Sequence, residues 1–344
     1  MSVVPNRVLL FGAIFSGNSG VDAVYDVVAL GELLIDFTPV GSSERGNPVF
    51  EANPGGAPTN VLACLAELGK GTGFIGKVGD DDFGRFLRQV LVDKGISTAG
   101  LVMDPAVPTT LAFVHLQPDG ERSFSFYRNP GADTRLQPEE LKEEMFSAQV
   151  FHFGSISLTH EPARSATLAA LQLAQEKGML ISYDPNLRPP LWPDLDEARR
   201  QMLSVMGHVD IVKLSREELE FLTGSHDMES SSERLYRQYG LKLLLITLGK
   251  EGCFYRLGGL TGRVPGFNVK SIDATGAGDG FLGGILFQVL EQGTDLEKWT
   301  SDQISAAVRF ANAVGALVTT QRGGIPAMPS LSAVRKLLQE QPLP

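Results

Sequence analysis

Residues 149–186, QVFHFGSISLTHEPARSATLAALQLAQEKGMLISYDPN, contain two apolar runs on either side of a helical pattern. The runs QVFHFGSISL and LISYDPN are short, which is typical of buried strands. Between them, PARSATLAALQLAQEKG carries apolar residues at helical spacing and ends at a glycine. A strand, a helix and a second strand in succession form the repeating unit of a parallel sheet.

The same alternation extends along the chain. It predicts strands at YDVVALGELLIDF (25–37), TGFIGKVG (72–79), DIVKLS (210–215), LKLLLITLG (241–249) and FNVKSID (267–273). It predicts helices at PTNVLACLAELG (58–69), DDFGRFLRQVLVDKG (81–95), REELEFLTG (216–224), GDGFLGGILFQVLEQG (278–293) and ISAAVRFANAVGALVT (304–319). The fold class is therefore α/β, with a mostly parallel sheet between two helical layers. We expect residues 24–340 to form a single domain, and residues 1–23 to be a leader outside it.

Two segments interrupt this rhythm. Residues 37–52 are polar and marked by proline and glycine, and residues 110–128 alternate apolar and polar around Pro118-Asp119-Gly120. The second pattern is typical of a β-hairpin. We expect a small β-sheet lid built from about 37–52 and 104–128, with an ordinary surface hairpin as the alternative for the second segment.

The composition is that of a globular enzyme, with 43% hydrophobic and 20% charged residues. The formal net charge is −10 and no Lys/Arg cluster occurs, which argues against nucleic-acid binding. The two cysteines, Cys64 and Cys253, have apolar neighbours and predict buried reduced thiols rather than a disulfide. No segment has the length and apolarity of a membrane helix, so we expect a cytoplasmic protein without membrane contact.

The stretch DATGAGDGF (273–281) lies between a predicted strand and a predicted helix. The backbone amides of Gly276, Ala277 and Gly278 should lie at the helix N-terminus, where unpaired donors and the helix dipole favour an anion. Asp279 would stand in the first helical turn beside them. The simpler alternative is a tight glycine turn with Asp279 as an ordinary helix-start carboxylate.

Two other glycine patterns do not support a phosphate site. GTGFIGKV (71–78) nearly matches a P-loop, but Val78 has no hydroxyl for magnesium and the segment resembles a strand. GDGFLG (278–283) matches GxGxxG, but it continues as a helix and would set Asp279 against a pyrophosphate.

Taken together, several segments resemble the ribokinase-like (PfkB) sugar kinases, and among them most of all the fructokinases. The segments occur in the family's order over roughly residues 26–330, namely GELLIDF, PGGAPTNVLACLAELG, FIGKVGDDDFG, FYRNPGAD, FHFGSISL, YDPNLRPPLWP, EELEFLTG and DATGAGDGF. The resemblance implies a phosphotransferase that moves the γ-phosphoryl group of ATP to a sugar hydroxyl, with Asp279 as catalytic base and Gly276, Ala277 and Gly278 as anion hole. It implies fructose as substrate, Mg²⁺ as cofactor, K⁺ as activator and a homodimer through the lid.

The remaining roles are also those that the resemblance implies. The sugar contacts would be Asp36, Gly55, Gly56, Asn60 and Arg128. The nucleotide contacts would be Asn186, Arg188, Thr247, Gly249, Gly252 and Asn312. Glu218 would orient water around magnesium, although Ser215 replaces the usual asparagine of that motif. Asp273 and Thr275, with carbonyls of residues 319–327, would bind the monovalent cation.

Two alternatives to a fructokinase stay open at this point. One is a kinase of the same fold that acts on 2-keto-3-deoxygluconate or ribose. The other is a sugar-binding relative that has lost catalysis, although the intact Gly276–Asp279 motif argues against it.

Overall fold

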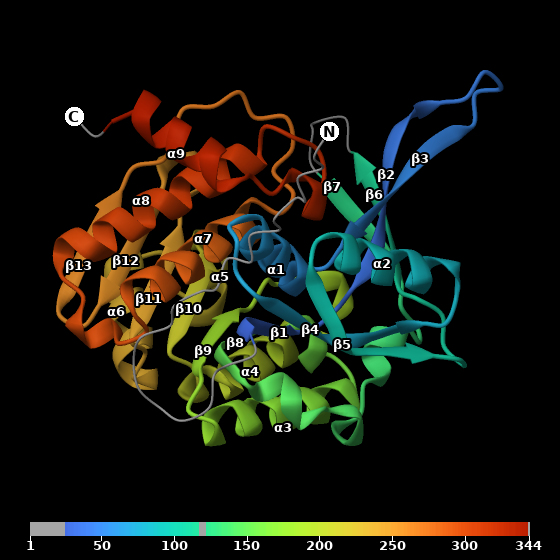
Figure 1. Ribbon diagram of the computed structural model, residues 1–344, viewed down its shortest axis with the longest axis horizontal. Helices are drawn as coiled ribbons and strands as arrows, with labels where there is room; N and C mark the ends of the chain where they lie inside the picture. The colour runs from blue at the N-terminus through green and yellow to red at the C-terminus, as the bar shows by residue number, and fades with distance from the viewer. Residues whose placement is uncertain (1–24, 117–121, 343–344) are drawn as a thin grey trace, which may run out of the picture.

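The computed structural model describes residues 25–116 and 122–342, and Figure 1 shows how their elements are arranged. The predicted leader and the Pro118-Asp119-Gly120 turn lie outside the described residues. No helix within the described ranges is long and apolar enough to cross a membrane.

A nine-stranded sheet forms the centre of the molecule, with the strand order β13-β12-β11-β10-β9-β8-β1-β4-β5. Its strands are β1 (Tyr25–Leu30), β4 (Thr72–Gly79), β5 (Ile96–Asp104), β8 (Ala148–Gly154), β9 (Leu180–Asp184), β10 (Ile211–Ser215), β11 (Leu243–Thr247), β12 (Cys253–Leu257) and β13 (Leu260–Val264). Neighbouring strands are parallel except at β11–β12 and β12–β13, which are antiparallel. This confirms the predicted α/β class and mostly parallel sheet.

Helices cover both faces of this sheet (Figure 1). One hydrophobic core joins the sheet to α1 (Ala57–Glu67), α2 (Asp82–Asp93), α7 (Ala277–Gln292), α8 (Ser301–Val318) and α9 (Leu331–Glu340). A second core joins the opposite face to α3 (Ala163–Glu176), α4 (Leu195–Ser204), α5 (Arg216–Thr223) and α6 (Met228–Tyr239). The periodicity predicted α1, α2, α3, α5, α7 and α8, whereas α4, α6 and α9 were not predicted.

A separate four-stranded sheet, called the lid sheet below, stands beside the core with the order β3-β2-β6-β7 (Figure 1). Its strands are β2 (Leu34–Ser42), β3 (Pro48–Gly55), β6 (Leu111–Leu116) and β7 (Arg122–Tyr127). Two antiparallel pairs, β2–β3 and β6–β7, are joined by parallel pairing of β2 with β6. The predicted small sheet and its hairpin are therefore confirmed.

Two predicted strands were wrong. The run 25–37 is two strands, β1 in the central sheet and β2 in the lid sheet, with a break at Gly31–Leu33. The pattern hid the break because Leu34 and Ile35 at the start of β2 are as buried as β1 itself. Residues 267–273 form no strand; instead the amides of Ile272 and Asp273 donate to the carbonyl of Thr319 at the end of α8.

Candidate active site

The glycine turn before α7 has the geometry of an anion site. Gly276 caps the helix in the left-handed region, with φ of 75°, which glycine adopts without strain. Ala277 and Gly278 follow as the first residues of α7, so their amides lie at the positive end of a sixteen-residue helix. The structure thus brings together the three residues of the predicted anion hole.

Asp279 lies in the first turn of α7 and is only 9% exposed. Burial raises the pKa of its carboxyl above the usual value, while Lys213 and a hydrogen bond from Asn60 act in the opposite direction. The amide Nδ2 of Asn60 donates to Oδ2 of Asp279 over 2.7 Å. The amide of Ala277 donates to the carbonyl of Ala274 over 3.2 Å within the turn. A buried carboxylate at the positive end of a helix suits a base that works next to an anion.

Asp279 lines a cavity of about 520 Å³, which lies between the lid sheet, the glycine turn and the carboxyl ends of the central strands. The lid sheet contributes the polar side chains of Asp36, Thr38 and Asn53 and the apolar side chains of Val114 and Phe126. A cavity of this size with mixed polar and apolar walls suits a small polar ligand. The lid sheet is therefore one wall of the site rather than an ordinary surface hairpin.

Asp36 extends into this cavity from β2 of the lid sheet, and not from the end of the first core strand as predicted. Burial raises the pKa of its carboxyl to about 6, and the Arg188 guanidinium opposes that shift. Gly55 packs against it, since a side-chain carbon there would come within 2.3 Å of Oδ2 of Asp36. Gly56 and Asn60, two of the predicted sugar contacts, also line the cavity.

Arg128 does not line the cavity. Its guanidinium is buried against Asp133, with 2.7 Å between nitrogen and carboxylate oxygen, and it donates to Oγ1 of Thr159 and the carbonyl of Ile156. These contacts fix the end of β7 to the core. The sequence shows an arginine after a hairpin but not the carboxylate that binds it.

Three buried charges of this site were missed by the sequence analysis. Glu32 accepts a 2.8 Å hydrogen bond from the amide of Ala57 at the start of α1, and burial raises the pKa of its carboxyl to about 7. Lys213 of β10 extends into the cavity, where its Nζ lies 2.8 Å from Oδ2 of Asp184 on β9. Charged residues within apolar strand runs, as in DIVKLS, were the available signal.

The predicted nucleotide contacts fall into two groups. Asn186, which has a left-handed backbone with φ of 48°, and Arg188 line the cavity near Asp279. The others do not line the cavity: Thr247 ends β11, Gly249 and Gly252 lie between β11 and β12, and Asn312 lies on α8. Asn312 donates to the carbonyls of Val264 and Pro265, so it holds the loop after β13.

The predicted metal-site residues bind backbone amides. Glu218 accepts from Leu187 through Oε1 and from Ser215 through Oε2, both over 2.8 Å, and Ser215 completes a capping box. Asp273 accepts from the amides of Thr275 (2.8 Å) and Gly323 (3.2 Å), which joins the glycine turn to the next loop. Within the described residues, no three His, Cys, Asp or Glu side chains gather to hold a metal by themselves.

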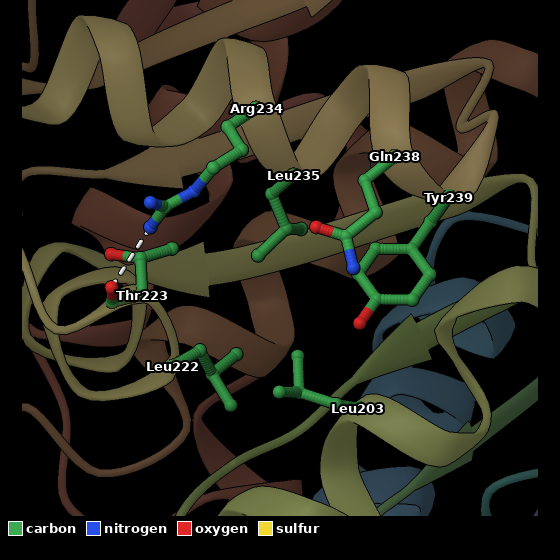
Figure 2. Close-up of a pocket in the computed structure, with 7 residues that line it drawn as sticks. All are labelled: Leu203, Leu222, Thr223, Arg234, Leu235, Gln238 and Tyr239. Atoms are coloured by element: carbon green, nitrogen blue, oxygen red, sulfur yellow. Dashed lines mark hydrogen bonds between the residues drawn. The ribbon is translucent and has the colours of Figure 1, made fainter.

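A second hollow of about 320 Å³ lies among α4, α5 and α6 (Figure 2). Its walls are Leu203, Leu222, Thr223, Arg234, Leu235, Gln238 and Tyr239. The guanidinium of Arg234 already donates to the carbonyl of Thr223 over 2.8 Å, as the dashed line shows. None of the predicted site residues lies there, so the cavity at Asp279 is the candidate active site.

Comparisons with known proteins show similarity over most of the chain. The model of the pfkB family of carbohydrate kinases matches residues 25–331. Fructokinase-1 of Zea mays is 47% identical, over 91% of this chain and 98% of the maize protein. Fructokinase of Xylella fastidiosa, solved with bound ATP, is 36% identical with a TM-score of 0.85, over 92% of this chain and 98% of that one. A double mutant of the Vibrio cholerae O395 fructokinase, solved with fructose, ADP and a potassium ion, is 36% identical with a TM-score of 0.82, over 92% and 99% of the two chains.

Proposed function

Because this chain belongs to the pfkB family of carbohydrate kinases, we propose that it is a fructokinase, which transfers the γ-phosphoryl group of ATP to fructose and forms fructose 6-phosphate and ADP. The observation that carries the proposal is the buried Asp279 carboxylate beside the Gly276–Gly278 amides, at the end of a cavity lined with polar groups. The resemblance inferred from the sequence is confirmed at the level of the family and of fructokinase relatives.

The geometry supports a direct transfer. Asp279 accepts the proton of the sugar hydroxyl as the oxygen–phosphorus bond to the sugar forms and the bond between phosphorus and the ADP oxygen breaks. The positive end of α7 at Gly276–Gly278 stabilises the negative charge on the transferred group. The base and the donors are neighbours in sequence because the phosphorus atom must lie between them.

The sugar is held by the lid sheet and α1. The carboxylate of Asp36 accepts hydrogen bonds from sugar hydroxyls, and Oδ1 of Asn60, which is buried and finds no partner among the described residues, accepts another. Val114 and Phe126 cover the carbon skeleton from the lid sheet. Fixed polar groups of this kind reject sugars that leave them unpaired.

Mg²⁺ fits the carboxylates near the glycine turn. Asp184 has one buried oxygen, Oδ1, without a partner among the described residues, and Glu218 lies close enough for its charge to act on Asp184. We propose that Asp184 and Glu218 hold the ion through water, and that Asn186 and Arg188 bind the phosphates. When bound, the ion neutralises phosphate charge. Thr247, Gly249, Gly252 and Asn312 are proposed to surround the rest of the nucleotide.

K⁺ fits between two loops beside the anion hole, the turn that begins at Asp273 and the loop of residues 319–327, which are called the loop pair below. Asp273 joins the amides of Thr275 and Gly323, and it supplies the hard oxygen donors that an alkali cation requires. We propose that K⁺ binds at Asp273, Thr275 and the carbonyls of residues 319–327 and keeps the glycine turn in place.

We propose that the protein forms a homodimer through the lid sheet, because the face of this sheet away from the cavity carries aromatic side chains. Phe37, Phe50, Phe113 and Tyr127 form an aromatic cluster on the side away from the cavity, where Phe37 also packs against Phe83 of α2. Tyr127 is 67% exposed, which is unusual for a large aromatic side chain in a cluster. A cytoplasmic location stays a prediction from the sequence.

The test is a coupled ADP-release assay with ATP and a panel of sugars, in which Asp279→Asn controls for contaminating kinases. We expect fructose to have the highest kcat/KM. Equal kcat/KM for ribose or 2-keto-3-deoxygluconate would show another sugar kinase. If calorimetry detected sugar binding but the assay detected no ADP release, the protein would be a sugar-binding relative that has lost catalysis.

A further inference from the structure

Lys213 is a buried cation at the glycine turn. It extends from β10 into the cavity and is 6% exposed. A side-chain carbon at position 278 would come within 2.9 Å of its Nζ, so the ammonium group lies directly against Gly278. Its position is therefore next to the amides that are proposed to bind the transferred phosphoryl group.

The ammonium group retains hydrogen-bonding capacity. Among the described residues it has one hydrogen-bond acceptor, Oδ2 of Asp184 at 2.8 Å, whereas a protonated lysine has three donors. Lys77 provides the contrast, since it is equally buried at 6% exposure but donates to both carboxylate oxygens of Glu140 and to the carbonyl of Arg135. Lys77 thus has three hydrogen-bond acceptors among the described residues, and Lys213 has one.

The excess of carboxylates around Lys213 also favours a role for its positive charge in binding a phosphoryl group. The carboxylates of Asp184, Glu218 and Asp279 all act on Lys213. Oδ2 of Asp184, 2.8 Å from Nζ of Lys213, forms a buried ion pair with the ammonium group. A phosphoryl group that entered beside three carboxylates would be strongly repelled without such a cation.

We propose that Lys213 is a catalytic residue of the phosphoryl transfer, in which its ammonium group donates to an oxygen of the transferred group. The proposal rests on the proposed kinase function. As the bond from phosphorus to the ADP oxygen breaks and the bond to the sugar oxygen forms, the hydroxyl proton moves to Asp279, and Lys213 stays protonated throughout. Asp184 holds the ammonium group in place, and Gly278 leaves room for it.

The first test replaces the charge. Lys213→Met keeps the length and apolar stem of the side chain, Lys213→Arg keeps the charge, and Lys77→Met is the matched control for loss of a buried strand lysine. We expect Lys213→Met to lower kcat by about 10²–10³-fold, as for loss of one oxyanion donor. Lys213→Arg should recover part of that loss, and folded Lys77→Met should keep kcat within about threefold.

Binding of a transition-state mimic distinguishes a catalytic role of Lys213 from a structural one. ADP with aluminium fluoride and fructose mimics the charged transferring group, and ADP alone does not. Lys213→Met should weaken binding of the mimic at least tenfold more than binding of ADP alone. If the two ligands weaken equally, or kcat stays within threefold of wild type, Lys213 is a structural residue and the proposal is wrong.

The pH profile gives a third readout. Asp279 is faced by Asn60 and Cys64 of α1, Asp184 of β9, Arg188 of the following loop, Lys213 of β10 and Glu218 of α5. Lys213 lowers the pKa of Asp279, so its removal should move the acidic limb of kcat/KM to higher pH. An unmoved limb in folded Lys213→Met would contradict the proposal.

A variant of Lys213 that does not fold would not test its role in catalysis. Removing one member of a buried pair leaves an uncompensated charge. Should Lys213→Met not fold, Lys213→Gln, whose neutral amide can still donate to Asp184, must show the same selective loss of the mimic. Wild-type protein that releases no ADP with any sugar would overturn the proposed function itself. Active wild type with an equally active, folded Lys213 variant overturns only the role of Lys213.

Discussion

The side-chain amide of Asn60 on α1 donates a 2.7 Å hydrogen bond to Oδ2 of Asp279 on α7, and both residues are buried. This bond fixes the base relative to the helix that follows the Gly55–Gly56 loop. Because α1 also carries cavity-lining residues, α1 and α7 together place the proposed base, Asp279, at the cavity.

Because of this hydrogen bond, Asp279→Asn should remove the proton acceptor with little other change to the structure. The carbonyl of the new side chain can accept from Asn60 in place of the carboxylate, so packing is preserved while the proton acceptor is lost. We expect kcat to fall by about 10²–10⁴-fold, with ATP affinity unchanged or improved because a negative charge is removed. Steady-state kinetics, calorimetry with ATP and the melting temperature measure this. Near-normal turnover with a loss of about 1 kcal/mol in stability would instead identify a helix-start residue.

Asp36 should make fructose binding depend on pH. Its pKa of about 6 means that acidification protonates the carboxylate and removes a charged acceptor, so KM for fructose should rise as the pH falls through 6. Asp36→Asn should raise KM by about 10-fold or more and lose that dependence. A pH-independent KM in wild type would remove Asp36 from the sugar site.

The same carboxyl should lower stability at high pH. Asp36 binds its proton more tightly in the folded protein, at about 6, than at its ordinary value of 3.8. Its contribution to stability therefore falls as the pH rises from about 4 through 6. Asp36→Asn should accordingly unfold at a higher temperature than wild type at pH 8, by about 1 kcal/mol in stability, with little difference at pH 4. A lower melting temperature at pH 8 would contradict this.

Potassium should activate the enzyme. At constant ionic strength, kcat in potassium chloride should exceed kcat in tetramethylammonium chloride several-fold, because the bulky ion cannot enter the loop pair at Asp273. Asp273→Ala should abolish the difference. Equal rates of wild type in the two salts would exclude a cation site there.

The lid sheet should respond to sugar. Saturating fructose should slow amide hydrogen exchange in β6 and β7, whose cavity-side residues Val114 and Phe126 would cover the ligand. The antiparallel pair β12–β13, at the far edge of the central sheet, is the internal control. Protection that also appeared in β12–β13, or none in either, would argue against closure of the lid.

The outer aromatic face should control assembly. Tyr127→Asp places a charge in the cluster of Phe37, Phe50 and Phe113 and should convert a dimer into a monomer in light scattering. Leu168→Asp, an exposed apolar position on α3, should leave the mass unchanged. A wild-type monomer at micromolar concentration would rule out the proposed dimer.

Local patterns predicted the parallel core and the glycine turn because each depends on neighbours in sequence. The strand runs, the helical spacing and the Gly276–Asp279 turn are visible within a few residues. The antiparallel edge strands β12 and β13 were not predicted, since short strands between glycines resemble loops. The split of residues 25–37 was missed because two sheets bury the same run of apolar side chains.

Partners distant in the sequence explain the remaining failures at the site. Nothing near Arg128 shows that Asp133 and Thr159 would bind its guanidinium. Likewise, the Lys213–Asp184 pair forms only when β9 and β10 lie side by side. Ion pairs between strands depend on topology, so they follow from the sheet order and not from any single motif.

The parallel pairing of β2 with β6 has a consequence for synthesis of the chain. The hairpin β2–β3 leaves the ribosome first, and two strands alone are marginally stable in water. Its open β2 edge has no neighbour until Leu111–Leu116 has been made, which takes several seconds at ~5–20 residues per second. Unpaired edges of this kind invite association with other chains. During this interval the unpaired β2 edge therefore exposes the nascent polypeptide to aggregation.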